Sequence, residues 1–304
     1  MEFTSFTNIV REEMEKKVGE NASVKLQEVM KNNGVKLCGM TVLQQDTNIS
    51  PTIYLNNYYA AYEKEKITLH EAVEDIWYHY KKNRLDKSVD ICFFMNYEAV
   101  KDRIVYKLVN TEKNQELLKD VPHIPFYDLS IVFQCLVSEE MFGNATILIH
   151  NAHLKLWGVD AQELYRQASL NTPRLYPYDI KNMRDVILEM IMLEEGEEAA
   201  QAHREELTQN VPMYVLSNCT KMQGAACLLY KDVLKDFAMV LQQDIYILPS
   251  SIHEVILLPA TEEDNPRLLK EMVEEINGTQ VEPEEVLSNS IYFYERKTGE
   301  FYVY

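Results

Sequence analysis

The 304-residue sequence has few of the residues that common cofactor and phosphate sites require. It contains nine glycines, and none of them falls in a GxGxxG, GxxxxGKS or GxxxxGKT pattern. Such patterns are needed because the backbone of a dinucleotide or phosphate loop must approach its ligand closely. Acidic residues at the spacing of a calcium-binding EF-hand are also missing. We therefore expect no cofactor.

Cysteine is also scarce and scattered. The five cysteines form no CxxC pair: Cys38, Cys92, Cys135, Cys219 and Cys227. This odd, dispersed set fits neither a zinc ribbon nor a disulfide framework, and it is typical of reduced thiols in cytosol. We predict a cytoplasmic protein.

Long apolar runs and an excess of positive charge are missing too. No apolar segment has the length of a transmembrane helix, and the N-terminus lacks the basic start and apolar core of a signal peptide. The 48 acidic and 30 basic residues give a net charge of −18. An acidic surface repels phosphates and anionic lipids, so we expect neither nucleic acid nor a membrane as a partner.

What the chain does have is enough apolar sequence, 46%, for a substantial core. Strands and helices alternate without a regular βαβ repeat, which predicts an α+β fold with a mixed or mainly antiparallel sheet. The segment 194–211 is highly charged and lacks aromatic residues, and it is our best candidate for a linker or helix extension. The predicted regions are a mainly helical 1–88 with a small strand element, an α+β 89–193, the linker 194–211, and an α+β 212–304 ending in a hairpin.

In the first region, Val24–Met30 is predicted to form a helix that Asn33-Gly34 ends, followed by a strand over Val35–Leu43. Thr68 and Glu71 form a capping-box pattern, and the helix behind it should run to Tyr80. Its apolar spacing predicts that Val73, Ile76 and Trp77 are buried.

In the later regions, Ile91–Met95 and Ile104–Val109 are predicted strands. The alternation in Leu129–Val137 predicts another strand, with Ala145–Ile149 as an antiparallel partner. Ala225–Leu241 has a helical pattern, and Ile291–Tyr304 is typical of a β-hairpin that turns at Thr298-Gly299.

The segment Ile245–Pro259 gathers several reactive side chains. Two apolar runs are interrupted by Pro249-Ser250-Ser251, and His253-Glu254 follows directly. Ser251 and His253 would share one face of an extended strand, as a nucleophile and base must, but Glu254 would point away unless the strand bends. The alternative is a structural loop, in which serine and proline serve the backbone. Ser250, Ser251, His253 and Glu254 are therefore weak catalytic candidates.

Two further groups of side chains have functional and structural interpretations. His150 and His153 have a spacing that can share a metal ion on a helical turn, with Asp160 as a third ligand, but histidine is also a common polar residue at a helix start. The C-terminal hairpin is aromatic on both faces, so one face should pack on the core and the other should form an interface. The interface candidates are Tyr292, Tyr294, Tyr302 and Tyr304.

Three segments resemble a known family. They are NNGVKLCGMTV with ISPTIYLNNYYAAYEKEKITL, LWGVDAQELYRQASLNT, and GAACLLYKDVLKDFAMVLQQDIYILPSSIHEVILLP. Together they are similar to the bacterial domain-of-unknown-function 5688 family, found as paralogues in gut Firmicutes. The pattern Trp157-Gly158-Val159 with Glu163-Leu164 more weakly resembles a second uncharacterised cytosolic family. Neither resemblance implies an activity or a ligand.

The sequence thus favours a non-enzymatic protein-interaction or regulatory module that binds a protein partner or itself. The acidic charge, the aromatic hairpin and the lack of a strong catalytic pattern support this interpretation. The alternative is a serine-type hydrolase that uses Ser250 or Ser251 with His253.

Overall fold

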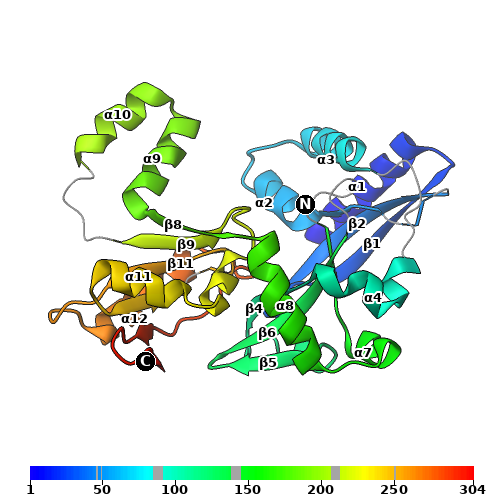
Figure 1. The fold of residues 1–304 in the computed structure, drawn as a ribbon. Helices are drawn as coiled ribbons and strands as arrows, with labels where there is room; N and C mark the ends of the chain where they lie inside the picture. The colour runs from blue at the N-terminus through cyan, green and yellow to red at the C-terminus, as the bar shows by residue number, and fades with distance from the viewer. Residues whose placement is uncertain (46, 49, 85–91, 138–144, 207–212, 250) are drawn as a thin grey trace. The chain divides into compact units, whose positions relative to one another are not determined.

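The computed structural model describes residues 1–45, 47–48, 50–84, 92–137, 145–206, 213–249 and 251–304. The chain divides into two compact units, Met1–Phe93 and Phe94–Tyr304. Within the described residues every pair of adjacent strands is antiparallel, which confirms the expected α+β class (Figure 1). Residues 194–211 fall in the second unit. The role of this segment as a linker stays a prediction.

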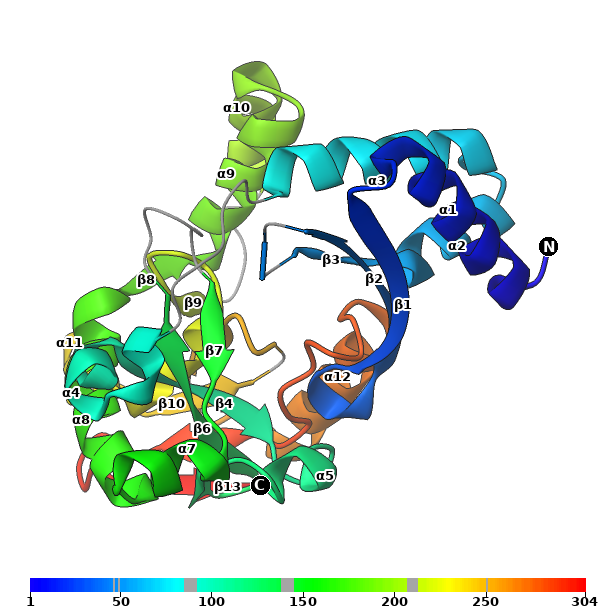
Figure 2. The same ribbon diagram turned by 90° about the vertical axis from the view of Figure 1, so that its right-hand side faces the viewer.

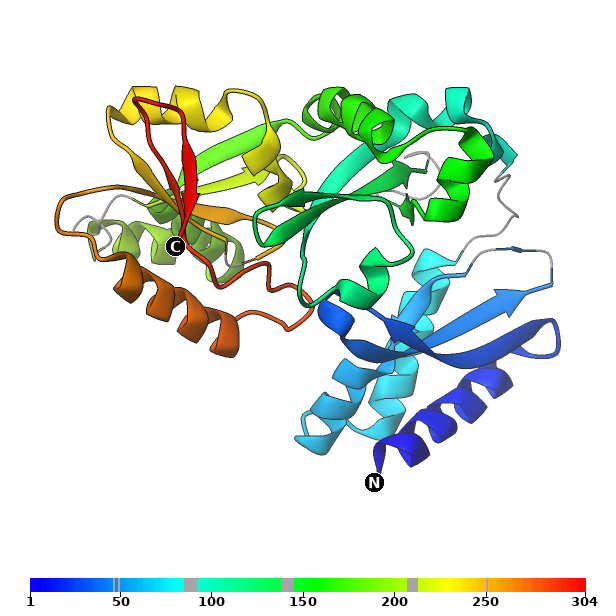
Figure 3. The ribbon, with the colours of Figure 1, turned by 90° about the horizontal axis from the view of Figure 1, so that it is seen from below.

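The first unit is a three-stranded sheet covered by three helices. Its elements are α1 (Phe3–Val18), β1 (Ala22–Met30), β2 (Lys36–Gln44), β3 (Thr52–Tyr54), α2 (Leu55–Glu63) and α3 (Leu69–Asn83), and the strand order is β1-β2-β3. The helices lie along one face of the sheet (Figure 3). Their apolar sides meet Met40 and Val42 of β2 in one core cluster.

The prediction of a helix over Val24–Met30 is wrong, because this segment is part of β1. It pairs with β2 over nine residues, from Ala22 opposite Gln44 to Met30 opposite Lys36. Asn33 and Gly34 both have positive φ, 60° and 69°, and they turn the chain between the two strands. An Asn-Gly pair suits a helix end and a hairpin turn equally well, so pairing with β2 decides between them.

Helix α3 begins as predicted, but its buried face differs by one residue. The Thr68 hydroxyl accepts the Glu71 N–H at 3.2 Å, and the Glu71 carboxylate accepts the Thr68 N–H at 2.7 Å. Val73 and Ile76 are buried as expected, whereas Trp77 is only half-buried and Tyr80 is buried in the core. The predicted burial of Trp77 is therefore wrong: its ring lies at the edge of the core and stacks on Tyr80.

The second unit begins with a small sheet. Its elements are a 3₁₀ turn η2 (Cys92–Met95), α4 (Tyr97–Val100), η3 (Lys101–Arg103), β4 (Ile104–Asn110), α5 (Gln115–Leu118), β5 (His123–Phe126), β6 (Leu129–Leu136), β7 (Thr146–Leu148), α7 (Asn151–Trp157) and α8 (Ala161–Leu175). Strand β6 lies between β4 and β5 and also pairs with β7, so the predicted antiparallel pairing of β6 and β7 is confirmed. The strand expected over Ile91–Met95 is wrong for the described residues 92–95, which form η2.

The second unit continues into a six-stranded sheet of order β13-β12-β10-β11-β9-β8. The strands are β8 (Tyr178–Asn182), β9 (Tyr214–Asn218), β10 (Ile245–Leu248), β11 (Val255–Pro259), β12 (Tyr292–Tyr294) and β13 (Phe301–Val303). Helices α11 (Val233–Leu241) and α12 (Pro266–Thr279) lie on opposite faces (Figure 3). The predicted C-terminal hairpin is confirmed as β12 and β13.

The helical pattern over Ala225–Leu241 is split in the structure. A 3₁₀ segment η5 (Gly224–Leu229) precedes α11, and Asp232 between them has a φ of 64° that no α-helix can contain. The apolar spacing continues across the break because both segments pack on the sheet.

Two helices, α9 (Met183–Glu194) and α10 (Glu197–Glu206), follow the edge strand β8 and form an arm beside the sheet (Figure 2). We call these two helices the helical arm. None of the helices among the described residues combines the length and the apolar character needed to cross a bilayer.

Candidate functional site

The loop between β10 and β11 carries the predicted serine–histidine group. Ser251 is buried, and its Oγ accepts the backbone N–H of His253 at 2.9 Å. The same hydroxyl bonds to the Glu254 carboxyl. Ser250 lies outside the described residues. The Ser251 hydroxyl is thus engaged by its own loop, not by the His253 ring.

Both nitrogens of the His253 ring have partners elsewhere. Nδ1 accepts the backbone N–H of Gln223 at 3.2 Å, and Nε2 lies 3.4 Å from the Glu285 carboxylate. Accepting an N–H at Nδ1 places the ring proton on Nε2, which faces Glu285. In this arrangement His253 has no nitrogen available to take a proton from Ser251.

The backbone of the same loop binds the segment that follows β9. The Ser217 hydroxyl donates to the carbonyl of His253 at 2.8 Å, and the Ala225 N–H donates to the carbonyl of Ile252 at 3.2 Å. Gly224 lies so close to these groups that a Cβ atom there would be 2.5 Å from the His253 oxygen. Ile252 and His253 therefore fix the loop that joins β9 to η5, which we call the β9–η5 loop.

Glu254 is half-buried beside this loop, and burial raises the pKa of its carboxyl. The neighbouring His253 ring and the hydrogen bond from Ser251 oppose that shift. General acids in active sites also have a raised carboxyl pKa. Glu254, however, is not among the residues that line the cavity described below.

The β9–η5 loop is tightly constrained. The buried Asn218 side chain accepts the N–H and the hydroxyl of Thr220 at 3.0 and 2.8 Å, and donates to the carbonyl of Met222 at 2.8 Å. Lys221 and Gln223 both have positive φ, 55° and 53°. Non-glycine residues adopt this conformation only where their surroundings enforce it, and such strain is frequent beside binding sites.

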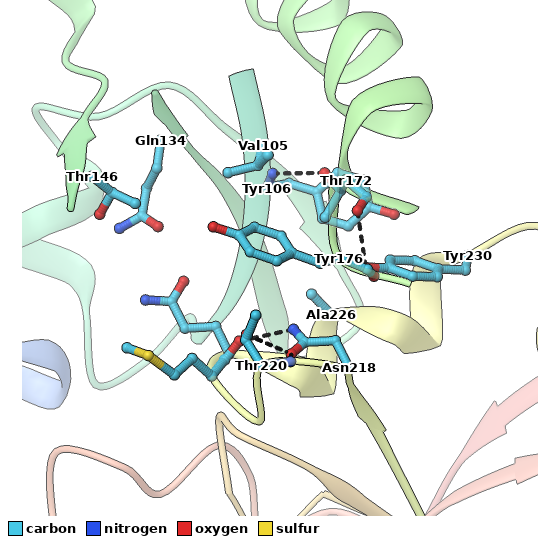
Figure 4. Close-up of a pocket in the computed structure, with 12 residues that line it drawn as sticks. Val105, Tyr106, Gln134, Thr146, Thr172, Tyr176, Asn218, Thr220, Ala226 and Tyr230 are labelled. Atoms are coloured by element: carbon cyan, nitrogen blue, oxygen red, sulfur yellow. Dashed lines mark hydrogen bonds between the residues drawn. The ribbon is translucent and has the colours of Figure 1, made fainter. Parts of the chain in front are cut away.

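The loop forms one wall of a cavity of about 80 Å³ inside the second unit. The opposite walls come from β4, β6, β7 and α8 (Figure 4). The lining residues are Val105, Tyr106, Gln134, Thr146, Thr172, Tyr176, Asn218, Thr220, Met222, Gln223, Ala226 and Tyr230. None of them carries a charge.

Most polar groups on the cavity wall are engaged in the fold. The Thr172 hydroxyl donates to Ala168 and accepts the N–H of Tyr106, and the Tyr230 hydroxyl donates to the carbonyl of Tyr176. The Tyr106 hydroxyl is different: it is buried and has no hydrogen-bond partner among the described residues. Burial raises the pKa of this phenol, so it remains a protonated donor at neutral pH.

The histidine pair forms a helix start. His153 Nδ1 accepts the backbone N–H of His150 at 2.9 Å, and His150 Nδ1 lies 2.7 Å from the Asp120 carboxylate. Asp160, the third ligand considered, caps α8 by accepting the Glu163 N–H at 2.8 Å. Within the described parts of the chain, no group of three or more His, Cys, Asp or Glu side chains is placed to hold a metal ion.

The C-terminal tyrosines separate by face. Tyr292 and Tyr294 are buried, and the Tyr292 hydroxyl donates to the Asp128 carboxylate at 2.6 Å. Tyr302 and Tyr304 are exposed. Only the second pair is therefore accessible to a partner.

Exposed apolar side chains also lie on α9 of the helical arm. Met190 and Met192 are each 55% exposed and Leu193 is 87% exposed, while only Leu188 of α9 is buried. The sequence pattern alone does not assign a role to this segment. The signal was available, because the run Val186–Leu193 is largely apolar and is followed immediately by an acidic stretch.

The cavity is not evident from the sequence. Tyr106 and Gln134 are polar residues within strands that are otherwise almost entirely buried, and a buried polar residue in such a strand is informative. Which strands face each other could not be read from the sequence, so the two residues could not be connected.

Comparison with known proteins places the chain in a family without giving it an activity. No curated protein and no solved structure matches the chain. A family of unknown function, DUF5688, matches residues 3–296, nearly the whole chain. The chain therefore belongs to the DUF5688 family.

Proposed function

We propose that the chain is a non-catalytic cytoplasmic protein-interaction module that binds a partner protein through α9 of the helical arm. The exposure of Met190 and Leu193, which are three residues apart and share one face of α9, carries this proposal. Grouped exposed apolar side chains mark interaction surfaces more often than scattered ones do. Methionine suits such a surface because its flexible, polarizable side chain adapts to different partners.

The acidic residues around this surface favour a positively charged partner. Residues 183–206 contain eight acidic and two basic side chains. Glu194, Glu195, Glu197 and Glu198 directly follow the apolar run. A partner could bury its apolar side chains against this surface and pair its flanking lysine or arginine side chains with these glutamates. The proposed occupant is a basic amphipathic helix of another protein.

Self-association is the weaker alternative. Two copies joined through their arms would bring the glutamates that follow each apolar run together, and like charges at an interface cost affinity. The hydrolase alternative gains no support from the loop geometry either, because the ring of His253 is bonded to Gln223 and faces Glu285.

The test uses a fluorescent peptide designed as a leucine–lysine amphipathic helix, with anisotropy as the measurement. We expect saturable binding that is weakened by Met190→Ser with Leu193→Ser. Losing burial of two partly exposed apolar side chains should reduce affinity about tenfold or more. Met239→Ser with Val240→Ser is the matched control, because these exposed residues lie on α11.

Equal weakening by both double variants, or no binding of the peptide by the wild type, would exclude α9 as the surface. A leucine–glutamate peptide of the same length checks the charge requirement and should bind at least tenfold more weakly. Light scattering of the chain alone measures self-association. A wild-type dimer that becomes monomeric in the α9 double variant would favour self-association over binding of another protein.

A further inference from the structure

Strand β1 is the longest edge strand among the described residues. It has nine residues and pairs with β2 alone, in one continuous register from Ala22 to Met30. It contains neither a proline nor a bulge, the devices with which native proteins often protect an exposed edge. Unpaired N–H and C=O groups along such an edge bind further strands. The length and regularity of β1 therefore suit it to accept another strand.

The hydrogen bonds at the two ends of the β1–β2 pair show which residues of β1 point outward. The Gln45 N–H donates to the Asn21 carbonyl at 3.1 Å, and the Lys31 N–H donates to the Val35 carbonyl at 2.7 Å. Because bonded pairs alternate along antiparallel strands, the odd-numbered residues of β1 bond to β2. The N–H and C=O groups of the even-numbered residues point to the open edge. These residues are Ala22, Val24, Leu26, Glu28 and Met30.

Lys25 provides the charge on this edge. The even-numbered Val24 packs in the core under the helices, so the odd-numbered side chains of β1 lie on the opposite face of the sheet (Figure 3). Lys25 is exposed there and has no ion-pair partner among the described residues. Glu28, on the face of Val24, already pairs with Lys36 at 2.8 Å. Lys25 is thus the side chain that can pair with a charge on an added strand.

The geometry of an added strand brings Lys25 close to its neighbour. In an antiparallel pair at this edge, the bonded positions are the even-numbered residues, so Lys25 occupies a non-hydrogen-bonded position. Side chains at such positions approach each other most closely. An opposite charge directly across from Lys25 stabilises the pair, and a like charge destabilises it. An aspartate or glutamate across from Lys25 is therefore favoured.

The distribution of charge along the chain also favours an acidic strand. Residues 22–44, which form β1 and β2, contain three lysines and one glutamate, although the whole chain has a net charge of −18. The first unit contains 12 basic and 14 acidic residues, so most of the negative charge belongs to the second unit. An acidic strand at β1 would meet a locally positive hairpin in a nearly neutral unit.

A second copy of β1 does not supply the acidic residue. When two outward edges pair in antiparallel fashion, bonded positions face bonded positions, so odd-numbered residues face odd-numbered residues. The odd-numbered residues of β1 are Ser23, Lys25, Gln27 and Val29, and none of them is acidic. Glu28 could face Lys25 only in a register that turns the bonding groups of one strand away from the other. The complementary strand therefore comes from another protein.

We propose that β1 binds an extended acidic segment of a partner protein as a fourth strand of the sheet in the first unit. Backbone hydrogen bonds to the even-numbered residues hold the segment, and Lys25 selects one with aspartate or glutamate opposite it. This surface belongs to the first unit and does not depend on the surface proposed on α9 of the second unit.

The experiment titrates the full chain with a fluorescent seven-residue peptide and measures anisotropy. The peptide alternates valine and threonine, with glutamate in place of the central threonine, and we expect saturable binding. The same peptide with a central lysine should bind about tenfold more weakly, because an attractive cross-strand pair becomes a repulsive one.

Hydrogen exchange locates the bound peptide. The outward amides of Leu26 and Glu28 should exchange more slowly when the glutamate peptide is present, because they gain a partner. The amides of Lys25 and Gln27 bond to β2 in the free protein, so their exchange should change much less. Protection that does not follow this alternation would contradict pairing at the edge.

Lys25→Glu should exchange the preference between the two peptides. We expect the glutamate peptide to bind about tenfold more weakly and the lysine peptide to bind more tightly than to the wild type. Lys64→Glu is the matched control, because it makes the same change in charge at the end of α2, outside the sheet. An unchanged preference in Lys25→Glu would overturn the proposal.

Glu28→Pro removes one outward N–H without removing a bond to β2, and it should weaken the glutamate peptide about tenfold or more. Glu28→Ala is its control, because it loses the same charge and keeps the N–H. A thermal melt checks folding of both variants. The two peptides with Lys25→Glu keep the test decisive if Glu28→Pro does not fold.

Two further outcomes overturn the proposal. One is the absence of saturable binding, or equal binding of the two peptides, by the wild type. The other is a wild-type dimer in light scattering that Glu28→Pro makes monomeric, which would assign the edge to a second copy. Met190→Ser with Leu193→Ser should leave the binding of both peptides unchanged, so failure at β1 is distinct from failure at α9.

Discussion

The His253 ring accepts a hydrogen bond from the backbone N–H of Gln223, with 3.2 Å between Nδ1 and N. This bond joins the loop after β10 to the loop after β9, thirty residues earlier in the chain. It makes His253 a support for the cavity wall, because Gln223 lines the cavity.

His253→Ala should lower the free energy of unfolding by about 1–3 kcal/mol, because it leaves the N–H of Gln223 without its acceptor. His253→Asn should cost less, since its side-chain oxygen can accept the same bond. Urea denaturation measures both. Equal losses in the two variants would show that the bond contributes little and that ring packing dominates.

A fluorophosphonate probe should not label Ser251. Its hydroxyl is buried and bonded within its own loop, and the His253 ring is directed to Gln223 and Glu285. Mass spectrometry of the treated protein checks this. Labelling that disappears in His253→Ala would support the hydrolase alternative.

Gly224→Ala should be severely destabilising, by about 2–4 kcal/mol, because overpacking of a tight contact forces the backbone to move. A Cβ at this position would lie 2.2 Å from the Ser217 hydroxyl and 2.5 Å from the His253 carbonyl oxygen. Gly278→Ala is the control. It lies in α12 with nothing within 4 Å of a built Cβ, so it should stabilise by about 0.5–1 kcal/mol.

His153 should make stability depend on pH. Burial, followed by the nearby His150, lowers the pKa of the His153 ring, while Asp120 acts in the opposite direction. The folded state therefore binds the proton less tightly than the unfolded state, and stability is lost as pH falls below about 6.5. Protonation at Nδ1 would also remove the acceptor of the His150 N–H.

His153→Gln provides the comparison, since glutamine at this helix position can accept the same N–H without titrating. Thermal melts between pH 7.5 and 5.5 should show the wild type losing more stability than the variant. Parallel curves would mean that His153 titrates alike in the folded and unfolded states.

Tyr80→Ala should destabilise the first unit more than Trp77→Ala. Tyr80 is almost fully buried, and its hydroxyl accepts from the Gln44 side chain at 3.0 Å, so we expect a cost of about 3–5 kcal/mol. Trp77 is half-buried, and about 1–2 kcal/mol is expected from its smaller loss of buried area. Chemical denaturation measures the difference, and the reverse order would place Trp77 in the core.

Local signals in the sequence were sufficient for several elements. The Thr68–Glu71 capping box, the antiparallel pair of β6 and β7 and the C-terminal hairpin each depend on residues close together in the sequence, and the structure contains all three. The same holds for the α+β class and the family membership.

Long-range pairing decided the rest. Val24–Met30 could form a helix or a strand, and only the presence of β2 beside it makes the strand. Trp77 and Tyr80 both lie on the apolar side of α3, and the positions of α1 and β2 determine which of the two rings is buried. The site depends on pairing even more: Tyr106, Gln134 and Gln223 lie in three separate segments, and only packing of the β9–η5 loop against β4 and β6 places them around one cavity. Sequence periodicity reports which side of an element is buried, but not which other element covers it.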